Sequence, residues 1–394
     1  MALVPVFVFS LFLHLFVGWQ LLGDLVTVSP NAAIATGALL VCSSVLIPVS
    51  MIGIRKRHSS LWDQGLQWIG LLCMGWFSSM LVFTLVRAGV LLLLHMAQLA
   101  LFPSLKLAAL QASSGLAVLV FAVGVSALGF WNARRTATVV KMDVPVPDLP
   151  AALHGFLVAQ ISDVHVGPTI KRPYLERIVD KVNLLGAHMV AITGDLVDGS
   201  VHELAEHIYP LARLQSTHGS FFVTGNHEYY SGANAWIEVI RALGVRVLMN
   251  EHHVVHHTNL ASRHTAVPIV IAGVSDFTAH HFDEKHRSDA HKAMAGAPEN
   301  AAYKLLLAHQ PRSAAQAALA GFDLQLSGHT HGGQFWPWNH FVRLQQPFTA
   351  GLHKLQNMWI YTSRGTGYWG PPKRFWAPSE ITLLRLVAAS ESMP

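Results

Sequence analysis

Seven residues in the second half of the sequence carry side chains that bind metal ions well, and they occur within short polar motifs. They are Asp163, His165, Asp195, Asn226, His309, His329 and His331. A carboxylate can bridge two cations, and imidazole suits Mn, Fe, Co, Ni and Zn better than Mg or Ca. Each motif alone is a weak signal, but the ordered set predicts one site for two divalent transition metal ions (Mn, Fe or Zn).

Such a pair of ions would perform phosphoester chemistry. Two cations about 3.5–4 Å apart stabilise both the attacking and the leaving oxygen of an in-line displacement at phosphorus. A water between them loses a proton near neutral pH, because the cations stabilise hydroxide. Metal-bound hydroxide could then attack phosphorus and hydrolyse a phosphodiester or pyrophosphate bond.

The elements that position these motifs are predicted β-strands, and a motif begins where each of five strands ends. Those five are expected over residues 155–161, 189–193, 219–224, 303–308 and 324–326. Further strands are expected over 245–249, 267–272, 359–362 and 380–386, and helices over 172–185 and 202–214. Strands that alternate with helices indicate an α/β domain. Ligands of open α/β sheets bind just beyond the carboxyl ends of strands, so the five motifs can converge on one place.

In chain order the motifs read Asp-x-His, Gly-Asp-x-x-Asp, Gly-Asn-His-Glu, His and Gly-His-x-His. This series resembles the calcineurin-like metallophosphoesterase superfamily. The fuller strings at 326–334, 363–367, 371–374 and 378–380 resemble its bacterial membrane-associated branch, which is related to UDP-2,3-diacylglucosamine hydrolases. The resemblance covers about residues 153–386 and implies a four-layer α-β-β-α sandwich.

The resemblance also implies a role for each residue. One ion would be held by Asp163, His165, Asp195 and His331, and the other by Asp195, Asn226, His309 and His329, with Asp195 as the shared bridge. His227 would not be a ligand but would stand beside the leaving group as the catalytic acid. Asp198 would orient a ligand or a loop, and it could also cap the helix that starts near His202.

Other cations and histidines have two interpretations each. Arg364, Lys373 and Arg374 could contact a phosphate group of the substrate or could be plain surface charge. The histidine pairs at 252–253 and 256–257 look like a metal-binding tract, but solvated strand positions are the preferred interpretation.

The composition of the first half predicts an all-α transmembrane bundle. Charged residues make up 12% of the 394 residues and the mean hydropathy is +0.38, whereas soluble proteins average about 25% charged residues. Four apolar stretches lie near 2–22, 32–54, 66–86 and 107–131, and a membrane-spanning helix needs roughly 20 residues. The third stretch continues to Phe102, so it is either one long helix or two segments.

Charges near these stretches predict the orientation and the boundaries. The basic clusters at 55–58 and 134–135 should stay cytoplasmic, which places the catalytic domain on the cytoplasmic side of the inner membrane. The expected organisation is a transmembrane region of about four helices at 1–138, a linker at 139–152 that could also be a first strand, and a phosphoesterase domain at 153–390.

Arg87 lies inside the third apolar stretch, where a charge facing lipid is costly. It would either contact a lipid headgroup or the substrate, or extend from a helix end to the membrane surface. The second interpretation is preferred.

Several classes of function are disfavoured. The two cysteines, Cys42 and Cys73, both lie in apolar stretches and leave no disulfide framework. The net charge of +5 comes without a long run of Lys or Arg, so no nucleic-acid partner is expected. Gly199 stands where phosphoprotein phosphatases of the resembled superfamily usually carry Arg. A lipid-linked, amphiphilic substrate is favoured, with membrane lipids as partners, and the alternative is a catalytically weak membrane sensor or scaffold.

Overall fold

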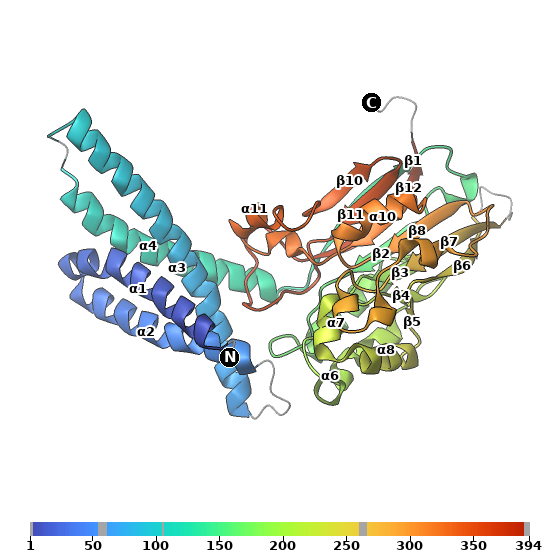
Figure 1. Cartoon of the computed structure of the whole chain (residues 1–394), viewed down its shortest axis with the longest axis horizontal. Coiled ribbons are helices and arrows are strands. Elements are labelled where there is room, and N and C mark those ends of the chain that lie inside the picture. The colour runs from blue at the N-terminus through green and yellow to red at the C-terminus, as the bar shows by residue number, and fades with distance from the viewer. Residues whose placement is uncertain (1–2, 54–60, 105, 260–265, 390–394) are drawn as a thin grey trace. The chain divides into compact units, whose positions relative to one another are not determined.

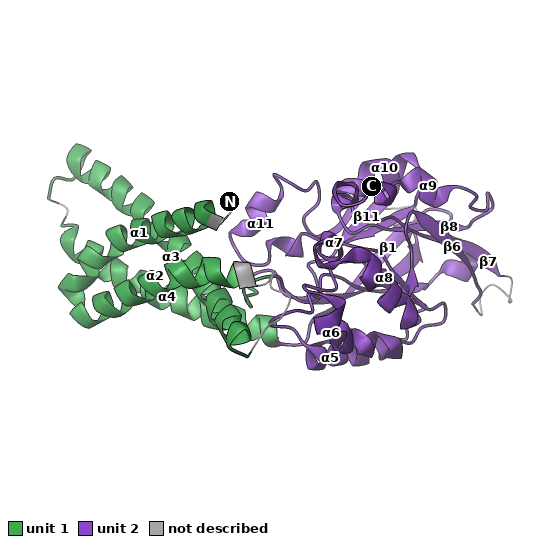
Figure 2. Ribbon diagram, turned by 60° about the horizontal axis from the view of Figure 1, so that its bottom comes forward, with its two compact units in different colours: residues 1–134, 370–375 green, residues 135–369, 376–394 purple. Residues whose placement is uncertain are grey.

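The computed structural model describes residues 3–53, 61–104, 106–259 and 266–389. The chain forms two compact units, which Figure 2 shows in different colours. Unit 1 contains Met1–Arg134 and Gly370–Phe375, and unit 2 contains Arg135–Trp369 and Trp376–Pro394. Each unit is described by itself below.

Unit 1 contains four long apolar helices. They are α1 (Leu3–Val28), α2 (Pro30–Gly53), α3 (Leu61–Ala100) and α4 (Ala108–Arg134). All four are long and apolar enough to cross a membrane, which agrees with the four predicted spans. The third stretch is a single helix of 40 residues rather than two segments. The basic cluster at 55–58, used above to predict orientation, lies outside the described residues.

Small residues allow the helices of unit 1 to approach closely. A Cβ atom added at Gly70 of α3 would lie 2.5 Å from the backbone oxygen of Leu46 on α2. Packing of this kind associates helices in lipid, where no hydrophobic effect drives them together. The interior of the bundle adds buried side chains such as Val17, Leu21 and Met80.

Arg87 is buried inside unit 1, so the preferred interpretation of its side chain was wrong. Its guanidinium forms an ion pair with Asp24 on α1. It also donates hydrogen bonds to Ser114 Oγ at 2.9 Å and to the backbone oxygens of Gln20 at 2.8 Å and Gln111 at 2.9 Å. A charge that finds this many partners within the bundle has no need to extend to the membrane surface.

Two further cations are buried in unit 1, within the segment Gly370–Phe375. Lys373 is 3% exposed and Arg374 is 0% exposed. The ammonium of Lys373 donates to the backbone oxygen of Gly75 at 2.8 Å, and the backbone N–H of Arg374 donates to that of Gly129 at 2.8 Å. The interpretation of these two residues as surface charge was therefore wrong, because both side chains are packed against helices.

Unit 2 contains two six-stranded sheets. The first has the order β1 (Thr138–Val146), β12 (Glu380–Ala388), β2 (Leu157–Ile161), β3 (Met189–Ile192), β4 (Ser220–Phe222) and β5 (Arg246–Val247). The second has the order β10 (Gly351–Leu355), β11 (Met358–Thr362), β9 (Leu324–Ser327), β8 (Tyr303–Leu307), β7 (Val267–Gly273) and β6 (Glu251–His257). Strands β2 to β5 run parallel to one another, as do β7, β8, β9 and β11.

The predicted four-layer α-β-β-α sandwich is confirmed (Figure 1). Apolar side chains of both sheets meet in one core, for example Val158 and Phe221 of the first sheet and Leu305 and Leu326 of the second. Helices α5 (Arg172–Asn183), α6 (Val201–Ile208) and α8 (Ala233–Ala242) cover the first sheet, and α9 (Ala290–Met294) and α10 (Ala314–Leu319) pack on the second. Each sheet is thus buried on both faces, which explains the continuous apolar runs of its central strands.

The segment predicted as a linker at 139–152 contains a strand. Strand β1 pairs in parallel with β12 along its whole length, from Thr138 opposite Glu380 to Val146 opposite Ala388. Val144 is fully buried in the core between the sheets. Residues 139–146 are therefore part of the sheet, as the alternative interpretation held.

Candidate metal centre

The loops that follow five parallel strands bring the seven predicted ligand residues together. Both sheets contribute: β2, β3 and β4 lead into one part of the site, and β8 and β9 lead into the other. The residues after these strands are, in order, Asp163 and His165, Asp195, Asn226, His309, and His329 and His331. Asn226 is also the first residue of helix α7 (Asn226–Ser231).

The backbone at these loops has an unusual conformation. Five of the ten described non-glycine residues with positive φ belong to the site: Asp163, His165, Asp195, His329 and His331, with φ between 52° and 69°. L-residues adopt this region rarely, because the Cβ atom crowds the backbone. Strained residues concentrate at functional sites, where the surrounding structure holds them. The sharp turns point their side chains inward.

One group of ligand atoms comes from Asp163, His165 and His331. The Nε2 atoms of His165 and His331 are 3.0 Å apart, and His331 Nε2 is 3.5 Å from Asp163 Oδ1. Zinc–nitrogen bonds of 2.0–2.1 Å in a tetrahedral site imply ligand atoms about 3.3 Å apart. The three side chains therefore have the spacing of ligands around one ion.

A second group comes from Asp195, His309 and His329. His309 Nε2 lies 3.1 Å from Asp195 Oδ2 and 3.2 Å from His329 Nδ1. The same Asp195 oxygen is 3.9 Å from His165 Nε2 of the first group. Asp195 thus faces both groups, as a bridging carboxylate would.

Two buried oxygen atoms at the site have no hydrogen-bond partner. They are Asp163 Oδ2 and Asn226 Oδ1. A cation held among the clustered imidazoles would satisfy both this carboxylate oxygen and this amide oxygen. These oxygens, together with the clustered imidazoles, fit a divalent metal site.

The electrostatics of the second group favour positive charge beside Asp195. Burial alone would raise the pKa of Asp195, but the imidazoles of His309 and His227 hold it well below its usual range. Burial alone would lower the pKa of His309, but the Asp195 carboxylate holds it well above its usual range. Burial lowers the pKa of His329 to about 3, so that imidazole is a neutral ligand. A carboxylate that stabilises a neighbouring proton so strongly would also stabilise a metal cation.

His227 is held beside the two groups by Asp198. Its Nδ1 is 2.5 Å from Asp198 Oδ1, and its Nε2 is 4.0 Å from Asp195 Oδ2. Burial would lower the pKa of His227, but the carboxylates of Asp195 and Asp198 raise it to about 9. These two carboxylates favour the protonated ring, whose proton could be donated. His227 also offers a ligand atom within 4.8 Å of those of His165 and Asp195.

Asp198 orients two rings at once, because the same oxygen is 3.0 Å from His165 Nδ1. The interpretation of Asp198 as a helix cap was wrong. The N-cap of α6 is Ser200, which forms a capping box with Glu203. Asp198 precedes the cap by two residues and lies against the site instead.

Glu228 was not predicted, although it holds the backbone of the site. Its side chain is fully buried and accepts four backbone N–H bonds, from Gly225 at 2.6 Å, Asp195 at 3.0 Å, Leu196 at 2.7 Å and Val197 at 3.3 Å. These bonds join the loop after β3 to the loop after β4. The sequence signal was available as an acidic residue directly after Gly-Asn-His.

We expect Glu228→Gln to destabilise unit 2. The amide offers only one acceptor oxygen, so at least one pair of buried N–H donors faces an NH2 group. The expected loss is about 3 kcal/mol, which corresponds to a decrease in Tm of roughly 6–12 °C for a domain of this size. Thermal unfolding of the full chain in detergent, followed by tryptophan fluorescence, measures it. Glu203→Gln, which removes a half-buried carboxylate of the α6 cap, is the matched control and should lower Tm far less.

Arg364 lies close to the site but is engaged by a carboxylate. Its Nε donates to Glu380 Oε2 at 2.7 Å, and its backbone N–H donates to Glu380 Oε1 at 3.1 Å. Its stem packs on Gly332, next to His331: a Cβ at Gly332 would lie 2.7 Å from Arg364 Cγ. A phosphate contact by Arg364 stays a prediction.

The histidine pairs at 252–253 and 256–257 do not join the site. His257 is buried against Phe156, and only His256 is exposed. The prediction of a solvated strand position therefore holds for His256 but not for His257. Among the described residues, each of the three groups of His and Asp that could hold an ion lies at the strand ends described above.

The chain is similar to several known proteins. The model of the calcineurin-like phosphoesterase family matches residues 156–333. A transmembrane protein with metallophosphoesterase domain from Bos taurus is 38% identical over 328 residues, which cover 80% of this chain and 73% of that protein. The protein of the same description from Danio rerio is 37% identical over 279 residues, which cover 70% and 62%. An uncharacterized metallophosphoesterase from Helicobacter pylori is 38% identical over 234 residues, which cover 59% and 60%.

This chain thus spans about three fifths of the zebrafish and Helicobacter relatives. Among solved structures, the calcineurin-like phosphoesterase YfkN from Bacillus subtilis aligns with a TM-score of 0.37 at 14% identity. That alignment covers 53% of this chain and 88% of the other.

Proposed function

Because this chain belongs to the calcineurin-like metallophosphoesterases, we propose that it hydrolyses a phosphodiester or pyrophosphate bond in a lipid-linked substrate. The observation that carries the proposal is that Asp195 faces both groups of ligand atoms, with two unpaired buried oxygens at the same place. A protein that had lost its activity would have no reason to keep both groups complete.

The proposed ligand sets follow the two groups. Asp163, His165, Asp195 and His331 would hold one ion, and Asp195, Asn226, His309 and His329 would hold the other. Bound divalent ions would supply positive charge that activates a water and neutralises the phosphate oxygens. The remaining steps belong to side chains of this protein.

His227 would donate its proton to the leaving oxygen. General acid catalysis of this kind typically raises the reaction rate 10²–10⁴-fold. The carboxylates of Asp195 and Asp198, which raise the pKa of His227, would favour the protonated ring. Asp198 would position His227 and His165 through their Nδ1 atoms, leaving each Nε2 directed at the site. Glu228 would fix the distance between the Asp195 loop and the Asn226 loop.

A lipid-linked substrate is supported by the four apolar helices and by relatives that are transmembrane proteins. Gly199 supports it indirectly, since phosphoprotein phosphatases of this superfamily usually carry Arg at that place. We propose a nucleotide-linked glycolipid or a phospholipid, in keeping with the resemblance to UDP-2,3-diacylglucosamine hydrolases. Arg134, the last residue of α4, and Arg135, which follows it, support a catalytic domain on the cytoplasmic side of the inner membrane. A topology reporter fused to the C-terminus tests that side.

The activity is tested on the purified full chain in detergent. We expect about two bound ions per chain, hydrolysis of bis(p-nitrophenyl) phosphate with Mn added, loss of activity in EDTA and recovery on addition of Mn. Lipid-linked pyrophosphates and phospholipids are then compared as substrates. A chain that binds two ions but cleaves none of these compounds would instead be a membrane sensor or scaffold.

A further inference from the structure

Unit 2 exposes a group of large apolar side chains beside the candidate metal centre. We call this group the aromatic rim, and its members are Tyr230, Phe282, Phe341, Leu344, Trp369 and Trp376. Leu344 is 82% exposed and Trp376 is 77% exposed. Exposed apolar groups of this size normally mark a surface that meets a partner or a membrane.

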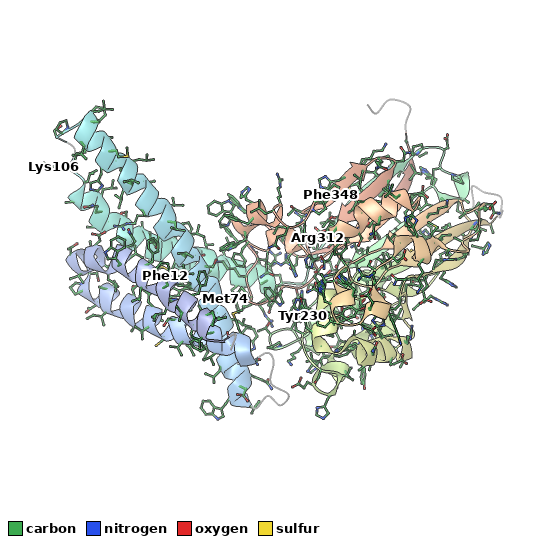
Figure 3. The ribbon with its side chains drawn as sticks, viewed as in Figure 1. Phe12, Met74, Lys106, Tyr230, Arg312 and Phe348 are labelled. Carbon is green, nitrogen blue, oxygen red and sulfur yellow. The ribbon has the colours of Figure 1, made fainter. Side chains whose placement is uncertain are left out.

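Two members of the aromatic rim, Tyr230 and Trp369, contact His227. The ring of His227 has its centroid 5.1 Å from that of Tyr230 and 5.7 Å from that of Trp369. Tyr230, labelled in Figure 3, is in turn 5.7 Å from Phe282. Rim residues from two different segments therefore contact the proposed leaving-group acid, so a leaving group that departs past His227 meets apolar surface.

The rest of the aromatic rim is fixed to the segment that follows the ligand His331. Gln334 exchanges two hydrogen bonds of 2.8 Å with the backbone of Trp369. Phe335 and Trp376 form a β-bridge. These contacts connect the rim to the metal centre through a few residues of rigid backbone.

Helix α11 (Trp338–Val342) carries Phe341 and leads to Leu344. It lies directly against the turn that contains His331, because a Cβ at Gly333 would be 2.2 Å from the Cα of Asn339. The rim and the ligands are therefore parts of one local structure.

The charge around the rim members from Phe341 to Trp376 suits an anionic surface, whereas Asp283 and Glu284 directly follow the rim residue Phe282. The stretch from Leu324 to Ser379 contains no Asp and no Glu. Arg343 lies between the rim residues Phe341 and Leu344 and is exposed. Aromatic and aliphatic side chains interleaved with cations are typical of surfaces that lie in the headgroup layer of a bilayer. Trp369 and Trp376 also immediately precede and follow the segment 370–375, which belongs to the membrane-spanning unit.

We propose that the aromatic rim lies in the headgroup layer of the membrane that holds the four apolar helices, and that an acyl-bearing phosphoester reaches the metal centre along it. The second clause rests on the proposed function, whereas the first does not. The partner is the surface of an anionic phospholipid bilayer. The acyl chains of the substrate would contact the rim while its scissile phosphate lies near His227.

The first test measures the position of the aromatic rim without any activity. In a chain with Cys42 and Cys73 replaced by Ala, a spin label is attached at Leu344→Cys and, as a control, at Leu184→Cys. Leu184 is 86% exposed and follows helix α5. In nanodiscs with anionic phospholipid, we expect the label at 344 to be relaxed more by lipid-soluble oxygen than by a water-soluble paramagnetic chelate. The label at 184 should show the reverse.

Two outcomes of this measurement would overturn the proposal. Equal exposure of both labels to the chelate would place the rim in water. Shielding of the label at 344 from both reagents would mean that protein, from this chain or a second copy, covers the rim.

The second test links the aromatic rim to the substrate. Leu344→Glu should reduce kcat/KM for a long-chain phosphodiester in anionic vesicles by roughly tenfold, because it removes a large apolar contact and adds a repelled charge. Hydrolysis of bis(p-nitrophenyl) phosphate should be unchanged, and Leu184→Glu should affect neither substrate.

The tests separate the two proposals. A wild-type chain that cleaves neither substrate overturns the proposed function, while the spin labels still decide the position of the rim. An active chain in which Leu344→Glu leaves both substrates unaffected, or slows both equally, overturns entry of the substrate along the rim.

Discussion

Replacement of Asp195 by Asn should lower kcat/KM for a generic phosphodiester by about 10³-fold or more, which corresponds to roughly 4 kcal/mol of transition-state stabilisation. Asp195 is the residue that faces both ligand groups, at 3.1 Å from His309 and 3.9 Å from His165. An amide keeps the shape but loses the charge that would hold two cations. Both ions should bind less tightly, so the measurement pairs kinetics with metal analysis by mass spectrometry.

The control for this variant is Asp180→Asn. Asp180 is an exposed residue of helix α5 that pairs with Arg213. The same chemical change there should leave both metal content and rate close to those of the wild type. If Asp195→Asn kept the wild-type rate, the assignment of the metal centre would be wrong.

Replacement of His227 by Asn should lower the rate by about 10²–10⁴-fold for substrates with an alkoxide leaving group. The loss should be far smaller for a p-nitrophenyl ester, because nitrophenolate departs without being protonated. Metal content should stay at the wild-type level. This split between leaving groups distinguishes an acid from a ligand, which loss of activity alone cannot do.

The control for His227 is His291→Asn, since His291 is an exposed residue of helix α9. That change should leave both leaving-group classes unaffected. A fall in the metal content of His227→Asn would instead make His227 a ligand, grouped with His165 and Asp195.

The metal centre could be predicted from the sequence because most of its ligand residues come just after predicted strands. Asp163 and His165 come just after an apolar run that predicts a buried strand, and the same holds for Asp195 and His309. Parallel strands bring such residues to one edge whatever the rest of the fold does. The four apolar helices could also be predicted, because the length and composition of a segment are enough to recognise such a helix.

The contacts that failed to be predicted join segments far apart in the chain. The ion pair between Arg87 and Asp24 links α3 to α1, and hydropathy shows only two isolated charges. Glu228 reads as an ordinary acidic residue near a helix start, and its four backbone donors come from two loops. Strand β10 was missed for a different, local reason: its sequence, Gly-Leu-His-Lys-Leu, is short and partly polar, and its pairing with the neighbouring strand β11 stabilises it.

The segment 370–375 has a consequence for anyone who wishes to produce the catalytic domain alone. Because this hexapeptide belongs to unit 1 while the residues on both sides belong to unit 2, the peptide chain passes between the units three times rather than once. A fragment that starts at residue 135 would retain Lys373 but discard Gly75 and Ser79, which accept its hydrogen bonds. Lys373 and Arg374, which are buried in the full chain, would then lie on its surface together with Phe375. Truncation at the apparent boundary should therefore leave this hexapeptide without the helices on which it packs, and a fragment with 370–375 replaced by a short glycine–serine linker would avoid that defect.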